Sequence, residues 1–185
     1  MIVGVSGKSG SGKSSVCKYL QSKLGYTYLD VDDLVKEIRA KYVGEIIELV
    51  GNDKFIVNSE INSKLLGQML FKDKQLMDKY NEYIYSKIKN ELIKITKENN
   101  NLIIDTMFLP VMEIFKNCDY KVLLICNDDI RKERVITRDN IDYKYFRQRE
   151  RYSIEYNYSD FDFIIDTSKI ETDEINEIIE KIKEV

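Results

Sequence analysis

Histidine is absent from the 185 residues of this sequence. Imidazole is therefore excluded as a general base, as a general acid and as a metal ligand. Any group that accepts a proton must instead be a carboxylate, a lysine, a tyrosine or a cysteine. The chain has only three cysteines, Cys17, Cys118 and Cys126, and their spacing matches no metal site. We expect them to be reduced, buried apolar residues.

Proline, long apolar runs and excess positive charge are also scarce. With a single proline, Pro110, and no internal repeat or polar linker, the chain is expected to form one domain over residues 1–185. No apolar run approaches the length of a membrane span and no signal peptide precedes the first strand, so we expect no membrane partner and a cytoplasmic location. A net charge of −3 argues against a nucleic-acid partner, because counterion release needs a broad basic surface. A monomer or a small homo-oligomer is expected.

The motif Gly7-x-x-x-x-Gly12-Lys13-Ser14 follows a short β-branched strand and precedes a helical pattern. This order is that of a phosphate-binding loop, in which backbone N–H groups and a helix N-terminus bind an anion. Lys13 is expected to contact the β- and γ-phosphates of ATP, and the Ser14 hydroxyl is expected to bind Mg²⁺. The residues predicted to bind ATP here are Gly7, Ser9, Gly10, Ser11, Gly12, Lys13, Ser14 and Ser15.

Hydrophobic periodicity predicts an α/β fold. We expect strands immediately before Gly7 and at residues 26–31, 102–105, 122–126 and 161–165, with amphipathic helices between them. Such alternation is typical of a parallel five-stranded sheet with helices on both faces, here of the P-loop NTPase type. The predicted core is residues 1–44, 101–130 and 160–185, with a helical acceptor-binding insertion at about 45–100 and an arginine-rich lid at about 131–159.

Three aspartates follow two of the predicted strands. Asp30 and Asp32 end the strand that comes after the first helix, and Asp105 ends the next apolar strand. A carboxylate in this place can accept the proton of an acceptor hydroxyl, and Asp32 is preferred to Asp30 as the base. The alternative is that Asp30–Asp33 caps the following helix. Asp105 is expected to help bind Mg²⁺, with a strand-end turn as the alternative.

Arginine is concentrated in one segment of the chain. Six of its seven arginines lie within 21 residues, and three of them recur at helical spacing: Arg131, Arg134 and Arg138. Guanidinium groups bind polyphosphate oxygens in pairs, and a mobile segment that carries them can close over a nucleotide. We expect Arg138 to act in catalysis and Arg134 to bind ATP with it; a solvated charged face is the alternative.

Together these motifs resemble the dephospho-CoA kinase family. The resemblance rests on Gly4–Val16, on Leu29–Asp32, on Leu102–Leu109, on Arg134-x-x-x-Arg138-Asp139 and on Asp162–Thr167, with a weaker match at Ser59–Phe71. It implies ATP-dependent phosphorylation of the ribose 3′-hydroxyl of dephospho-CoA, with Asp32 as the base. It also implies an acceptor site that includes Asp30, Asp32, Asn81 and Asp105.

The sequence departs from the family pattern at Asn81-Glu82, Asn62-Ser63, Met107–Val111 and Thr167. Most of these departures fall on the acceptor side. The phosphate loop is equally similar to that of uridine kinases, so a nucleoside or nucleotide acceptor is the alternative. A nucleotide-binding protein that has lost transfer activity is a third possibility.

Overall fold

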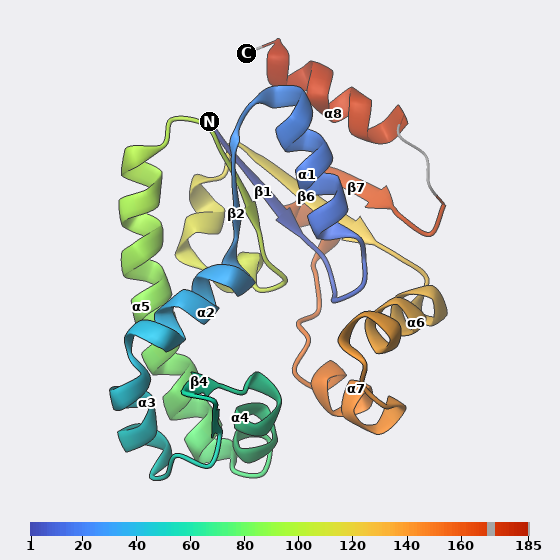
Figure 1. Cartoon of the computed structure of the whole chain (residues 1–185). Helices are drawn as coiled ribbons and strands as arrows, with labels where there is room; N and C mark the ends of the chain where they lie inside the picture. Colours follow the sequence, from blue (N-terminus) through green and yellow to red (C-terminus); the bar gives the residue numbers. More distant parts are fainter. Residues whose placement is uncertain (170–172, 185) are drawn as a thin grey trace. The chain divides into compact units, whose positions relative to one another are not determined.

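The computed structural model describes residues 1–169 and 173–184 of the chain. Its contacts divide the chain into two compact units. We call residues 1–31 with 96–185 the sheet unit and residues 32–95 the helical unit. Figure 1 shows the elements of both.

The sheet unit is built on one parallel five-stranded sheet. Its strands are β1 (Ile2–Ser6), β2 (Thr27–Asp30), β5 (Leu102–Asp105), β6 (Tyr120–Ile125) and β7 (Phe163–Asp166). The strand order is β2-β5-β1-β6-β7. The α/β class and the parallel five-stranded sheet predicted from the apolar runs are thereby confirmed.

Four α-helices and three short 3₁₀ turns accompany this sheet. They are α1 (Lys13–Leu24), α6 (Asp128–Asp139), α7 (Tyr143–Glu150), α8 (Asp173–Lys183), η1 (Leu109–Val111), η2 (Glu113–Asn117) and η3 (Tyr158–Asp160). Helix α1 ends at Gly25, whose φ of 69° suits a residue without a side chain. In residues 1–169 and 173–184, none of the helices combines the length and the apolar composition needed to cross a bilayer.

The core of the sheet unit lies mainly under α1 and α8. Leu20 of α1 and Ile178 of α8 pack with strand residues such as Val5 and Leu124 in one buried cluster. On the other face of β1, a Cβ atom added to Gly4 would lie 2.6 Å from Leu109 Cδ2, so η1 approaches the strand closely. Four isoleucines of α8 are buried: Ile175, Ile178, Ile179 and Ile182.

The helical unit contains most of α2 (Val31–Lys41) and α5 (Lys74–Glu98), together with α3 (Val43–Val50), α4 (Ser63–Leu70) and the hairpin of β3 (Ile56–Val57) and β4 (Glu60–Ile61). The long helix was expected from its apolar spacing. The hairpin was not expected, because two-residue strands carry too little periodicity to be detected.

Candidate active site

The phosphate-binding loop joins β1 to α1 and has the backbone conformation of an anion nest. Gly10 and Gly12 have φ angles of 84° and 85°, in the left-handed region that favours glycine. A Cβ atom at Gly10 would lie 2.6 Å from the Arg131 carbonyl oxygen, so no larger residue fits there without a shift. Helix α1 begins at Lys13, directly after these glycines, and adds its N–H groups to the nest.

Most of the predicted ATP-binding residues line a common cavity of about 680 Å³. Its walls come from the loop and from α6: Gly10, Gly12, Lys13, Ser14, Ser15, Ile130, Glu133, Arg134, Thr137 and Arg138. The cavity therefore brings together the loop and the two arginines singled out from the sequence, Arg134 and Arg138. Gly7, Ser9 and Ser11 belong to the same loop but do not appear among these wall residues.

The loop residues are also suited to an anion. Lys13 Nζ lies 3.5 Å from the Lys8 carbonyl oxygen, so its ammonium group folds over the loop. The buried Ser11 hydroxyl has no hydrogen-bond partner among the described residues. A cationic side chain, a glycine nest and an unsatisfied hydroxyl in one loop together fit a polyphosphate.

Two carboxylates lie side by side at the carboxyl ends of β2 and β5. β2 pairs with β5 in a register that places Asp30 opposite Asp105. Ser14 Oγ donates a hydrogen bond of 3.1 Å to Asp105 Oδ2, and Tyr28 Oη donates one of 3.0 Å to the same oxygen. Tyr28 Oη also lies 3.4 Å from Asp30 Oδ2. The hydroxyl of Ser14 and the carboxylate of Asp105, the two predicted Mg²⁺ ligands, are therefore in direct contact.

Burial shifts the pKa values of Asp105 and Tyr28. Asp105 is 3% exposed, and burial raises its pKa to about 6, while the nearby charge of Lys13 acts in the opposite direction. Burial also raises the pKa of the Tyr28 hydroxyl, which therefore stays a hydrogen-bond donor at neutral pH. Oxygen ligands of this kind suit Mg²⁺, which is bound by one or two carboxylates together with phosphate oxygens.

Tyr28 was missed by the sequence analysis. It lies two residues before Asp30 in β2, so both side chains are on one face of the strand. That spacing was the only signal available, and it is indistinguishable from ordinary alternation in a strand.

Asp32 lies in the helical unit, in the first turn of α2, together with Asp33. Acidic residues in a first helical turn are favoured by the helix dipole whether or not they have a chemical role. Asp32 is exposed, whereas Asp30 is half-buried at the end of β2. Asn81 is half-buried in α5, also in the helical unit.

The three arginines of α6 are used in two ways. Arg134 Nη1 donates a hydrogen bond to the Gly10 carbonyl oxygen at 3.3 Å, and Arg138 Nη2 donates one to Ser9 Oγ at 3.3 Å. Both line the cavity. The helical spacing predicts Arg131 on the same face as these two arginines. Its side chain is instead only 4% exposed and is paired with Asp128 and Glu150.

Thr167 stands where the family resemblance suggests an asparagine near the nucleotide. Its Oγ1 lies 2.7 Å from the Ser11 carbonyl oxygen and 3.1 Å from that of Ile125. It also lines a second cavity of about 450 Å³, next to Val16, Tyr19 and Ile165. This cavity shares Gly12, Ser15 and Arg134 with the first, so the two are contiguous along the loop.

Comparison with known proteins agrees with this geometry. The family model described as dephospho-CoA kinase matches residues 1–170. The dephospho-CoA kinase of Fusobacterium nucleatum is 34% identical over 145 residues, which cover 76% of this chain and 75% of that protein. That of Aquifex aeolicus is 27% identical and covers 99% of this chain and 94% of its own length.

The fold is shared with a solved structure from the same group. The dephospho-CoA kinase from Campylobacter jejuni superposes with a TM-score of 0.66 at 18% identity, over 99% of this chain and 96% of that one. The phosphate loop, the parallel sheet and the extent of the sequence match lead to one conclusion. This chain belongs to the dephospho-CoA kinase family.

Proposed function

We propose that this protein transfers the γ-phosphoryl group of ATP to the ribose 3′-hydroxyl of dephospho-CoA and so produces coenzyme A. The observation that carries the proposal is the cavity of about 680 Å³ that the phosphate loop and α6 enclose, in a chain whose relatives are dephospho-CoA kinases. Phosphoryl transfer needs positioning and charge stabilisation more than covalent chemistry, and this cavity offers both.

In this proposal the loop binds the phosphates of ATP. The N–H groups from Gly7 to Ser15 surround the β-phosphate, and Lys13 contacts the β- and γ-phosphates. The base and ribose extend into the second cavity, beside Tyr19 and Thr167. Arg134 lies between the two cavities, since it lines both.

Ser14 and Asp105 would hold Mg²⁺, which neutralises phosphate charge when it is bound. Ser14 Oγ lies 3.1 Å from Asp105 Oδ2, and this short separation supports the assignment because both oxygens could bind the same ion. For the bound ion Asp105 has to lose its proton, and Lys13 favours the ionised carboxylate.

Asp32 is proposed as the base that accepts the proton of the 3′-hydroxyl. Its exposure supports this choice, since an incoming acceptor can reach it. Asp30 lies opposite Asp105, with its Oδ2 atom 3.4 Å from Tyr28 Oη, so a positioning role suits it better. Arg138 stabilises the charge on the transferred group, and Asn81 contributes to acceptor binding.

A screen of ADP release tests the proposed function. The purified protein is mixed with ATP, Mg²⁺ and one acceptor at a time: dephospho-CoA, uridine, cytidine or a nucleoside monophosphate. We expect rapid ADP release with dephospho-CoA only, and a product that carries a 3′-phosphate. A faster rate with a nucleoside would assign a nucleoside kinase, and release that no acceptor stimulates would contradict transfer altogether.

A further inference from the structure

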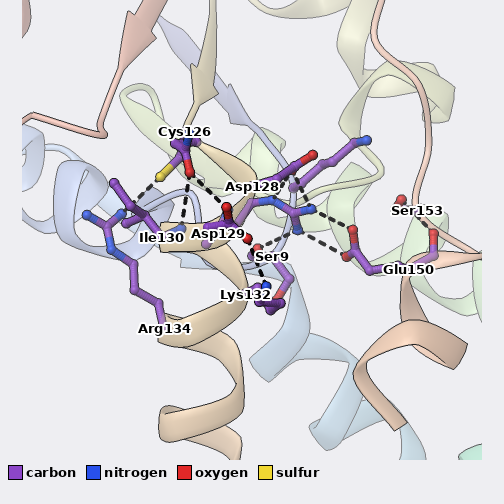
Figure 2. A network of polar contacts seen from close by, with 12 residues as sticks. Ser9, Cys126, Asp128, Asp129, Ile130, Lys132, Arg134, Glu150 and Ser153 are labelled. Atoms are coloured by element: carbon purple, nitrogen blue, oxygen red, sulfur yellow. Dashed lines mark hydrogen bonds and ion pairs between the residues drawn. The ribbon is translucent and has the colours of Figure 1, made fainter. Parts of the chain in front are cut away.

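The Arg131 guanidinium is held by three partners from three segments of the sheet unit. Nη1 and Nη2 donate to Glu150 Oε1 and Oε2, at 3.0 and 2.6 Å. Nε and Nη2 donate to Asp128 Oδ1, at 3.2 and 2.9 Å. Nη1 also donates to the Ser9 carbonyl oxygen, at 3.0 Å. The three residues that hold this group, Ser9, Asp128 and Glu150, are labelled in Figure 2.

The contact with Ser9 orients the next amide of the phosphate loop. In a trans peptide the C=O and the following N–H point in opposite directions. With the Ser9 carbonyl directed at Arg131, the Gly10 N–H points away from it. Gly10 lines the nucleotide cavity, whereas Arg131 is buried and does not line it, so an N–H that points away from Arg131 is directed toward the side where phosphate binds.

The contact with Glu150 ties the same arginine to the last residue of α7. Glu150 is 19% exposed, and the bidentate geometry is the strongest form of an arginine–carboxylate pair. The α6–α7 hairpin has only a small apolar core, formed by Val135, Ile141 and Phe146 with Ile136 and Tyr145 at its edge. Burial alone would lower the pKa of Arg131, yet its hydrogen bonds to Glu150 and Asp128 raise it, so the group stays charged.

We propose that the buried Arg131–Glu150 pair is a positioning device for the phosphate loop: it fixes the Ser9 peptide, and through it the Gly10 amide, to the fold of the α6–α7 hairpin. The inference rests on the nucleotide-binding part of the proposed function. It makes Arg131 a positioning residue, because it acts on phosphate through the loop and does not touch it.

A second ion pair on the same helix offers a matched control. Lys132 and Asp129 are each one residue further along α6 than Arg131 and Asp128, and their charged atoms are 2.8 Å apart. Their side chains are 37% and 87% exposed, and an exposed pair of this kind contributes little. Removing it takes away one positive and one negative charge, as the test variant does, without reaching the loop.

The test uses the double variant Arg131→Met/Glu150→Leu, which removes both buried charges and keeps the apolar contact between the helices. The control is Lys132→Met/Asp129→Leu. Calorimetry measures ATP and ADP binding without an acceptor, hydrogen exchange follows residues 7–15 in the protein without nucleotide, and the thermal midpoint reports folding. The KM for dephospho-CoA is measured in parallel.

We expect the double variant to bind ATP and ADP about tenfold more weakly, because a tenfold loss corresponds to one well-oriented hydrogen bond. Residues 7–15 should exchange faster, while the thermal midpoint and the KM for dephospho-CoA stay near those of the wild type. The control variant should match the wild type throughout. If the double variant unfolds, Arg131→Lys carries the test, since lysine keeps the charge but ends one atom short of the guanidinium nitrogen that Glu150 and Ser9 share.

Unchanged nucleotide affinity together with unchanged exchange in the loop would overturn the inference. Failure of the proposed function would look different: the wild type itself would bind no ATP. The exchange measurement needs no nucleotide, so it would still decide whether Arg131 orders the loop.

Discussion

Polar side chains are used differently in the sheet unit and in the helical unit. Around the phosphate loop, arginine side chains donate to backbone carbonyls as well as to side chains, as Arg131 does to Ser9 and Arg134 to Gly10. The one arginine of the helical unit, Arg39, instead donates to the Tyr80 hydroxyl at 2.6 Å and to Ser63 Oγ at 3.2 Å.

This difference separates two tasks. Phosphate binding depends on the direction of backbone N–H groups, so the sheet unit holds its backbone in place. Side-chain contacts can be exchanged for others without moving the backbone, and two of the departures from the family pattern, Ser63 and Asn81, lie in the helical unit. We therefore expect substitutions in the sheet unit to act on ATP and those in the helical unit to act on the acceptor.

The largest effect is expected for Lys13→Ala. Without its charge at the β- and γ-phosphates, phosphoryl transfer should fall to the background of the assay while the thermal midpoint is unchanged, because Lys13 is outside the apolar core. Turnover in a coupled ADP assay and thermal unfolding check this. Lys18→Ala, an exposed lysine of the same helix, is the control. Near-normal turnover by folded Lys13→Ala would contradict the assignment of the ATP site to the phosphate loop of the sheet unit.

Asp32→Asn should lower kcat by about two to four orders of magnitude, because the amide is nearly isosteric but cannot accept the proton. ATP affinity should be unchanged, since the loop binds the triphosphate. Asp30→Asn should be milder. Asp33→Asn is the control, because Asp33 lies in the same turn and pairs with Lys36.

Rapid-quench kinetics and ATP binding measure these three variants. The opposite ranking would make Asp30 the base. Loss of ATP affinity in both Asp30→Asn and Asp32→Asn would mean that the two carboxylates organise the metal. Asp32 would then contradict the expectation that residues of the helical unit act on the acceptor.

Arg138→Ala should lower kcat/KM by about tenfold to a thousandfold, as expected for one contact to the transition state. Its side chain is 58% exposed at the cavity and is paired with Asp139, so truncation should leave the fold intact. Steady-state kinetics with Arg147→Ala, an exposed arginine of α7, as the control would test it. If Arg138→Ala and Arg134→Ala were both silent, the arginines of α6 would be no more than a solvated face.

Asp105→Asn should stabilise the protein at neutral pH in the presence of EDTA. The folded-state pKa of Asp105 is raised to about 6 from 3.8, so its ionisation weakens folding as the pH rises through about 6. The gain is at most about 3 kcal/mol, at 1.36 kcal/mol for each pKa unit.

Urea unfolding between pH 4 and pH 8 measures this gain. The difference between Asp105→Asn and the wild type should shrink as the pH falls below about 6, where Asp105 takes up its proton. Asp78→Asn, an exposed carboxylate of α5, should show no such trend. A difference independent of pH would show that burial does not disfavour the Asp105 carboxylate.

The smallest effect is expected for Asn81→Ala in the helical unit. Loss of one hydrogen bond to an uncharged group should lower kcat/KM for dephospho-CoA by about threefold to tenfold and leave the KM for ATP unchanged. Asn90→Ala, on an exposed position of the same helix, is the control. A larger change in the KM for ATP than in kcat/KM for dephospho-CoA would contradict the expectation that the helical unit acts on the acceptor.

The sequence by itself determined the elements whose signals are local. A β-branched strand, a glycine-rich loop and Lys13-Ser14 follow one another without interruption, so the phosphate loop and its helix could be predicted. The apolar strands are short continuous runs, and the parallel sheet followed from their alternation with helices. The position of Asp105 at a strand end came from the same pattern.

Only the tertiary structure decided how equivalent side chains are used. Arg131, Arg134 and Arg138 follow one another at intervals of three and four residues, yet Arg131 is buried because Glu150, 19 residues later, folds back against it. Tyr28 contacts Asp105 because β2 lies beside β5, although 77 residues separate the two in the chain. Local periodicity places a residue on a face, but the partner that covers that face comes from distant parts of the chain, and so burial and pairing are properties of the folded molecule.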